Sequence, residues 1–374
     1  MTIYLDNNAT TKVALSVADI IQKYLLEEYG NSGSRTHEFG VKAKQAVELA
    51  RQQVADVIDV NKSDVIFTSG ATESNNIAIL GLKEFSETSN KKHIITTEIE
   101  HKAVLEPCQE LEKYGFDVTY LKTDQTGLIS KESLSEALRE DTVLVSIMHV
   151  NNETGSLQDI SGFCDILKDH DCYFHVDAAQ SFGKYNDDLK NSRIDMLSAS
   201  SHKCYGPKGI GALILRRRGF KKVPLKPLMF GGGQEKGLRP GTLPVAFIAG
   251  FGEACRLASI HAKEWAIHCQ ELKSEVMQEL SHINAIINGE NTVPHVINFS
   301  IPNLNSETAL VVLKGLIAVS NGSACTSSSY TPSHVLTSMG LDEDRIDNAI
   351  RMSWSYDTKE IPLVQVIEKI KQFL

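Results

Sequence analysis

The sequence predicts an α/β protein whose largely parallel, twisted sheet is covered by helices on both faces, followed by a smaller second domain. From about residue 35 to 250, segments with helical periodicity alternate with short runs rich in β-branched residues. Strands that alternate with helices form parallel sheets enclosed by those helices. With 374 residues, of which 42% are hydrophobic and 23% charged, the chain is long enough to bury two cores.

Apolar residues at helical spacing, such as Val47, Ala50, Val54 and Ile58, predict a helix over 41–58. A second helix is predicted over 72–87. The predicted strands are short β-rich runs at 65–67, 93–97, 118–121, 143–148, 173–176 and 211–215. Sheets of this kind place ligands outside the carboxyl ends of their strands.

The pattern changes after Pro244, where we predict a long helix from 245 to about 280. A strand-like run near 295–300 and helices up to the C-terminus follow, which indicates a smaller domain. One segment is biased in composition: 320–329, SNGSACTSSS, consists of small polar residues and is expected to be an exposed, mobile loop.

The formal net charge of -9 argues against strong direct binding of nucleic acid. One local basic cluster, interpreted as a solvated face, consists of Arg216, Arg217, Arg218, Lys221 and Lys222. The sequence contains no apolar run of the roughly 18 residues that cross a bilayer, and MTIYLDNNATT lacks the layout of a signal peptide, so we expect a cytoplasmic protein without a membrane partner.

The seven cysteines are scattered and form no CxxC pair. This pattern argues against a disulfide framework and against a metal site, and most of the cysteines are expected to be small buried hydrophobes.

Lys203 lies among small and polar residues just before Gly206, Pro207 and a β-rich run. Alone it is interpreted as an exposed loop lysine, but this setting also suits an amine that forms a Schiff base. Upstream, Asp177 closes a strand-like run, where a carboxylate pairs well with a protonated pyridine nitrogen; taken singly it is a turn or cap residue.

The segment TSGATESNN, 68–76, follows a strand and opens a helix. Backbone N–H groups around Ala71 and Thr72 are therefore candidates to hold a phosphate, although a plain helix cap is the alternative. His101, just after another β-rich run, could stack on a cofactor ring or be a structural histidine. The coincidence of lysine, aspartate, phosphate loop and histidine at successive strand ends favours the functional interpretation.

Cys325 is unusual because its surroundings are polar. A thiol at the tip of such a loop suits a nucleophile that enters an active site, attacks sulfur as a thiolate and swings out with the product. The alternative is a loop cysteine without function.

Together these motifs resemble the NifS/IscS-type cysteine desulfurases, class V aminotransferase relatives with the pyridoxal phosphate (PLP) fold type I. The resemblance extends from YLDNNATT to IRMS and rests on FTSGATESNN, EHKAVL, VSIMHVNNETG, HVDAAQSFGK, SSHKCYGPKGIGAL, RPGTLPV and NGSACTSSS, in the family's order. It implies a large domain, 13–256, with a mainly parallel seven-stranded sheet between helices, and a smaller α+β domain formed by 1–12 and 257–374.

The resemblance also implies the roles of individual residues. Lys203 would form the Schiff base with PLP, Asp177 would contact its pyridine nitrogen, Gln180 its phenolic oxygen, and His101 would stack on its ring. The phosphate would be bound by Thr72, Ser200 and His202, joined by Thr242 from the partner subunit of a homodimer. The carboxylate of the substrate, L-cysteine, would be held by Asn152, which also lies at the cofactor, and by Arg351 in a bidentate pair.

In the implied reaction, the amine of Lys203 removes the Cα proton of cysteine and Cys325 attacks its sulfur. The products are a persulfide on Cys325, which passes sulfur to an acceptor protein, and L-alanine. Two departures bear on the acceptor: the chain ends at KIKQFL without the longer tail of the scaffold-supplying members, and SWSYD, 353–357, replaces a glycine-arginine pair. These departures favour a specialised acceptor, and the desulfurases of DNA phosphorothioation systems are one such class; tRNA thiolation and iron-sulfur assembly are the alternative destinations.

Two other interpretations are open. Another enzyme of the same fold, a selenocysteine lyase or an aminotransferase, would not need the thiol at Cys325. A sulfur-relay or assembly subunit without catalysis would not need Lys203, Asp177 and His101.

Overall fold

The computed structural model describes residues 2–321 and 331–374, so Cys325 and most of the predicted loop lie outside the described residues. Its central element is a seven-stranded sheet of order β2-β8-β7-β6-β5-β3-β4. The strands are β2 (Val65–Thr68), β3 (His93–Thr97), β4 (Asp117–Leu121), β5 (Thr142–Met148), β6 (Tyr173–Asp177), β7 (Met196–Ser200) and β8 (Gly211–Leu215). Strand β8 is antiparallel to both neighbours and the other pairings are parallel, as predicted for a mainly parallel sheet.

All six predicted strands of the large sheet are present, but β7 was missed. Its sequence, MLSAS, contains no β-branched residue, so its strand conformation follows from burial between β6 and β8 rather than from local propensity.

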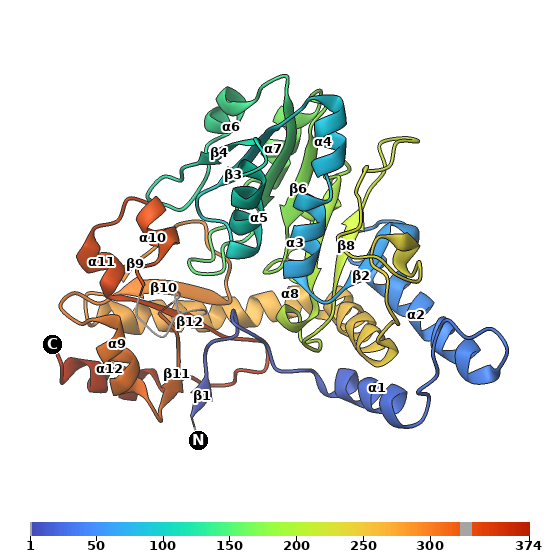
Figure 1. The fold of residues 1–374 in the computed structure, drawn as a ribbon. Coiled ribbons are helices and arrows are strands. Elements are labelled where there is room, and N and C mark those ends of the chain that lie inside the picture. The colour runs from blue at the N-terminus through green and yellow to red at the C-terminus, as the bar shows by residue number, and fades with distance from the viewer. Residues whose placement is uncertain (1, 322–330) are drawn as a thin grey trace.

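Both faces of the sheet are buried, because alternate residues of a strand point to opposite sides. Ile66 and Leu213 belong to a core with α3 (Ala71–Leu80) and α5 (Lys102–Glu112). Phe67 and Ile214 belong to the other core, which α2 (Glu38–Asp56), α6 (Lys131–Ala137), α7 (Ile160–Leu167) and the start of α8 (Val245–Ser281) complete. Figure 1 shows these helices on the two sides of the sheet.

The single helix predicted over 72–87 is wrong, since the chain forms α3 and then α4 (Lys83–Ser89). The break lies at Gly81, whose carbonyl oxygen accepts a hydrogen bond from the backbone N–H of Lys226 at 2.9 Å. A tertiary contact therefore competes with continuation of the helix.

A second core lies beyond the middle of α8, which runs beneath both parts of the molecule (Figure 1). It contains an antiparallel sheet of order β12-β10-β9, with β9 (Ile286–Ile287), β10 (Val296–Ser300) and β12 (Ala349–Ser353). The helices of this part are α9 (Ser306–Leu313), α10 (His334–Ser338), α11 (Glu343–Asp347) and α12 (Leu363–Lys371). Helices follow residue 300 as predicted, and β11 (Ile317–Ala318) and β12, which were not predicted individually, also lie there.

The N-terminus joins this second part before the chain enters the large sheet. Strand β1 (Ile3–Tyr4) pairs in parallel with β11, and α1 (Leu15–Leu26) then packs on α8. The domain boundaries at 12/13 and 256/257 stay a prediction. Among the helices of the described chain, none is long and apolar enough to span a membrane.

Candidate functional site

Six strands end at one edge of the large sheet, which brings the predicted residues of the site together. Strands β3, β4, β5, β6 and β7 run parallel, and β2 shares their direction because β8 is antiparallel to both β2 and β7. Asp177 and Ser200 are the last residues of β6 and β7, and His101 follows β3 within four residues. The predicted convergence at strand ends is therefore present in the structure.

Asp177 is a buried carboxylate with fixed orientation. Its Oδ2 accepts a hydrogen bond from Asn75 Nδ2 at 2.7 Å, and its Oδ1 accepts from the backbone N–H of Ala179 at 2.9 Å. Sequence reasoning missed Asn75, although it belongs to the quoted TSGATESNN segment. Nearby, Gln180 donates from Nε2 to the carbonyl oxygen of Asn8 at 3.0 Å, while its Oε1 is buried and has no partner within the described chain.

The start of α3 offers backbone donors. Gly70 is the N-cap residue and supplies no side-chain cap, and the first hydrogen bond of the helix runs from Ser74 N to Gly70 O. The N–H groups of Ala71 and Thr72 therefore precede the first bonded turn, where the helix dipole favours an anion. A Cβ built on Gly70 would lie 3.6 Å from Ser200 Oγ, so the hydroxyl of Ser200 borders the same cradle.

Lys203 lies in a short 3-10 helix (Ser201–Lys203) directly after β7. Its Nζ donates to the carbonyl oxygens of Asn8 at 2.5 Å and Ala9 at 2.9 Å. The preceding His202 contacts Thr10 Oγ1 through Nδ1 at 3.2 Å, and burial lowers the pKa of this histidine to about 4. An uncharged His202 can still donate one ring N–H to a phosphate.

Residues 6–11 form a strap along the site, which sequence reasoning did not find. Besides holding Lys203, Asn8 donates from Nδ2 to the carbonyl oxygen of Asn152 at 3.1 Å. Local sequence patterns could not predict the position of the strap, because the residues that it contacts at the site are between about 140 and 350 residues away along the chain.

His101 is the N-cap residue of α5, where its Nδ1 accepts from the backbone N–H of Ala103 at 3.0 Å. The side chain is exposed, yet the surrounding protein lowers its pKa by desolvation. The carboxylate of Asp177 opposes this effect and the amine of Lys203 adds to it. A neutral imidazole is suited to stacking on an aromatic cofactor.

Arg351 lies in β12 of the second part and reaches the site from there. Its NH1 donates to the carbonyl oxygen of Asn152 at 3.0 Å, and its NH2 pairs with Asp6 Oδ1 at 2.6 Å. The structure thus brings Asn152 and Arg351 together, as the family resemblance implies, and it adds Asp6, which sequence reasoning did not single out.

The two described segments that flank 322–330 are both anchored beside the candidate site. Before it, Ser320 exchanges backbone hydrogen bonds with Arg351. After it, Ser333 Oγ donates to Glu153 Oε2 at 2.5 Å, and His334 Nε2 donates to the carbonyl oxygen of Glu100 at 2.9 Å.

The other cysteines are poor candidates for a nucleophile. All six in the described part of the chain are free and buried: Cys108, Cys164, Cys172, Cys204, Cys255 and Cys269. Burial raises the pKa of Cys172 and of Cys269 to about 11 and that of Cys164 to about 12, which disfavours the reactive thiolate. The prediction that most cysteines are buried hydrophobes is confirmed.

The family resemblance implies that Thr242 acts from the partner subunit. It is exposed on the segment that leads into α8, and no hydrogen bond between described residues joins it to the site. No group of three or more His, Cys, Asp or Glu side chains able to hold a metal ion occurs in residues 2–321 and 331–374.

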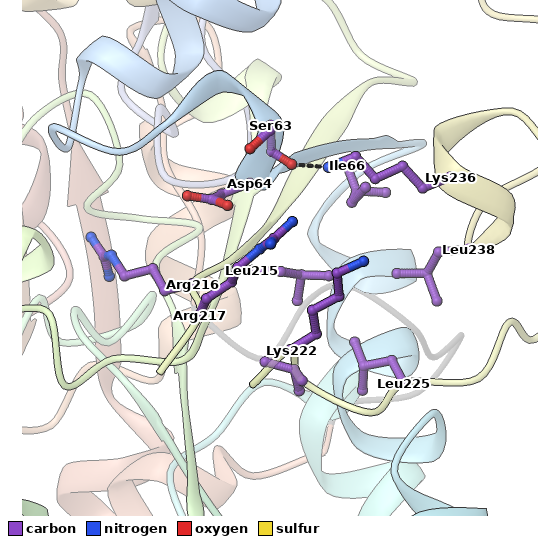
Figure 2. Close-up of a pocket in the computed structure, with 11 residues that line it drawn as sticks. Ser63, Asp64, Ile66, Leu215, Arg216, Arg217, Lys222, Leu225, Lys236 and Leu238 are labelled. Carbon is purple, nitrogen blue, oxygen red and sulfur yellow. Dashed lines mark hydrogen bonds between the residues drawn. The ribbon is translucent and has the colours of Figure 1, made fainter. Parts of the chain in front are cut away.

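A cavity of about 180 Å³ lies at the opposite edge of the sheet, where β2 begins and β8 ends (Figure 2). Arg216, Arg217, Lys222 and Lys236 line it together with Asp64 and apolar side chains, and Lys236 donates to the carbonyl oxygen of Ser63. The interpretation of the basic cluster as a solvated face is wrong in part. Arg216 is buried and donates to the carbonyl oxygen of Leu189 at 2.6 Å, and Arg218 pairs with the buried Asp195.

Glu100, directly before His101, is a further buried group that sequence reasoning missed. Burial raises its pKa to about 8 from the ordinary 4.5, although the backbone N–H of Met148 and the hydroxyl of Thr97 donate to its Oε1. Its Oε2 is buried without a partner in the described residues. The side chain is therefore protonated at neutral pH.

This burial predicts a pH dependence of stability. Between about pH 4.5 and about pH 8 the native state binds more protons at Glu100 than the unfolded chain, so the contribution of Glu100 to stability falls as the pH rises. Glu100→Gln mimics the protonated acid, and its unfolding free energy relative to the wild type should increase from pH 5 to pH 8. Thermal unfolding across this range measures the difference, with the exposed Glu106→Gln as the control. A constant difference would contradict a raised pKa at Glu100.

The donor set fits PLP. A buried carboxylate, a half-buried amine and a helix start with unbonded N–H groups suit the pyridine nitrogen, the aldehyde carbon and the phosphate, respectively. The unpartnered Oε1 of Gln180 is a further polar atom available to a ligand.

Comparison with known proteins agrees with this geometry. The family Aminotransferase class-V matches residues 3–361. Cysteine desulfurase IscS of Vibrio campbellii is 45% identical over 374 residues, which cover 99% of this chain and 92% of the relative. Among solved structures, a NifS-like protein superposes with a TM-score of 0.92 at 38% identity over 100% of both chains, and DndA from Streptomyces lividans with 0.82 at 46% identity over 93% of this chain and 98% of that chain.

Proposed function

Because the chain belongs to the aminotransferase class-V family and is a PLP-dependent cysteine desulfurase, we propose that Lys203 binds the cofactor covalently and that Cys325 receives the sulfur. The observation that supports this assignment most directly is the convergence of the Lys203 amine, the Asp177 carboxylate and the open start of α3 at one edge of the sheet.

Each end of the cofactor has a matching group in the proposed assignment. Asp177, held by Asn75, would keep the pyridine nitrogen protonated, and Gln180 Oε1 would accept a hydrogen bond from the phenolic hydroxyl. Ala71, Thr72, Ser200 and His202 would bind the phosphate. When bound, PLP withdraws electrons from the substrate and so makes its Cα proton acidic.

The protein then has three tasks. Arg351 and Asn152 bind the carboxylate of L-cysteine, and the Lys203 amine accepts the Cα proton once it has left the carbonyl oxygens of Asn8 and Ala9. The Cys325 thiolate forms a bond to the substrate sulfur as the carbon-sulfur bond of the substrate breaks. The three-carbon fragment takes up protons and leaves as L-alanine, while Cys325 retains the persulfide.

We further propose a homodimer in which Thr242 reaches the phosphate of the partner subunit. The exposure of Thr242, which makes no hydrogen bond to the site among the described residues, supports this arrangement. The sulfur then passes to an acceptor protein. Purification from the native cell separates the candidate pathways, because co-purifying DNA-modification proteins, tRNA-thiolation proteins or an iron-sulfur scaffold would each identify one of them.

The carboxylate assignment predicts the effect of Arg351→Ala. A charge-assisted bidentate contact contributes on the order of 1.5 to 3 kcal/mol, so the KM for L-cysteine should rise roughly 10-fold to 100-fold. Arg351→Lys should restore it only in part, because an ammonium lacks the planar fork. Steady-state kinetics at varied cysteine measure both, and an unchanged KM in Arg351→Ala would show that other residues bind the carboxylate.

A further inference from the structure

Arg351 is a buried cation whose hydrogen-bonding capacity is only partly used. Its side chain is 4% exposed, and that of its ion-pair partner Asp6 is 22% exposed. NH1 donates to Asn152 O and NH2 to Asp6 Oδ1, while Nε is buried and has no partner among the described residues. The guanidinium therefore keeps N–H donors available for another acceptor.

Asp6 is itself held by the strand that carries Arg351. It forms a parallel bridge with Ser353, two residues after Arg351 in β12, and the neighbouring Asn7 N donates to Ser353 O at 3.2 Å. The hydroxyl of Tyr4 donates to the carbonyl oxygen of Asp6 at 2.9 Å. The backbone of Asp6 is thus fixed relative to β12, and its carboxylate pairs with Arg351 NH2 from this position.

A buried guanidinium without a counter-charge is costly and would reorient towards solvent or other acceptors. One acceptor on NH1 and one on NH2 define the plane of the guanidinium and its rotation within that plane. We propose that Asp6 is a positioning residue for substrate recognition, which holds the Arg351 guanidinium so that its remaining N–H groups, Nε–H among them, bind the substrate carboxylate. This inference rests on the proposed role of Arg351.

The strap that contains Asp6 also contacts the other end of the site. Two and three residues later, the carbonyl oxygens of Asn8 and Ala9 accept from Lys203 Nζ. Asn8 also donates to Asn152 O, the same oxygen that accepts from Arg351. One short segment therefore relates the position of the carboxylate-binding arginine to that of the amine.

The test compares two ligands that differ only in the carboxylate. Titration calorimetry of the PLP-loaded protein gives its affinities for L-alanine and for L-alaninamide, and the wild type should prefer L-alanine. Asp6→Asn should reduce this preference by about 10-fold and raise the KM for L-cysteine by a similar factor, with kcat changed by less than about 2-fold. Asp6→Glu, which keeps the charge but moves it by one methylene, should give an intermediate preference.

Lys12→Gln is the matched control. It removes the exposed ion pair of Lys12 with Asp357 at 3.5 Å, which joins the residues just after the strap to those just after β12, away from Arg351. This variant should leave both affinities unchanged. An unchanged preference in Asp6→Asn, or an equal loss for both ligands, would overturn the inference, since a purely structural role weakens both alike.

Arg351→Ala separates this inference from the proposed function. Loss of the preference in Arg351→Ala with retention in Asp6→Asn refutes only the role of Asp6. Retention in Arg351→Ala refutes the carboxylate role of the arginine itself. Should Asp6→Asn fail to fold, Asp6→Glu takes its place, and an unchanged preference there overturns the inference.

Discussion

Cys325→Ser is expected to reduce sulfide release from L-cysteine to background while PLP binding is retained. Serine is nearly isosteric with cysteine, but its hydroxyl is far less acidic than a thiol and attacks sulfur poorly. PLP binding should survive, because the groups proposed to bind it, Lys203, Asp177 and the start of α3, are all placed by the large sheet. Sulfide and alanine assays, together with the absorption of the bound cofactor, measure the separation of the two roles.

Mass spectrometry of the wild type after brief exposure to cysteine should find one additional sulfur on the peptide that contains Cys325. Cys204→Ser is the control, since Cys204 is buried beside Lys203 and its Sγ donates to Ser201 O at 3.3 Å, a bond that serine can also make. This variant should keep sulfide release. Sulfur found on Cys204, or wild-type sulfide release by Cys325→Ser, would refute the proposed nucleophile, and alanine production that survives Cys325→Ser would favour a lyase or an aminotransferase.

Lys203→Ala is expected to abolish both desulfuration and the covalent attachment of PLP. The purified wild type should be yellow, and reduction with borohydride should attach the mass of the cofactor to the peptide that contains Lys203. Without the amine, any cofactor that binds is held only by non-covalent contacts and should be lost on dialysis. Absorption spectra and peptide mass mapping check these outcomes.

The control for this prediction is Lys208→Ala, because Lys208 is exposed in the same segment. This variant should keep its colour and its activity. A Lys203→Ala protein that still carries PLP on a lysine after dialysis and reduction would show that another amine binds the cofactor.

The sequence alone determined the alternation of strands and helices and the residues that close the strands. Buried strands are short runs rich in apolar and β-branched residues, so 93–97 and 211–215 were predicted with their observed bounds. Asp177 and His101 could be assigned to one edge because parallel strands end on the same side of a sheet. Strand β7 was not predicted because MLSAS lacks β-branched residues. The break between α3 and α4 was not predicted because it depends on the distant Lys226.

Only the tertiary structure decided how the N-terminal strap and the second part complete the site. Asp6 contacts Arg351, Asn8 contacts Lys203 and Gln180, and Asn75 fixes Asp177, and each pair is more than 100 residues apart in the chain. Sequence patterns report local periodicity and the ends of elements, whereas these contacts depend on how separate elements pack against one another. The residue types therefore indicated the chemistry of the site, whereas the positions of the charged groups in the site followed only from the fold.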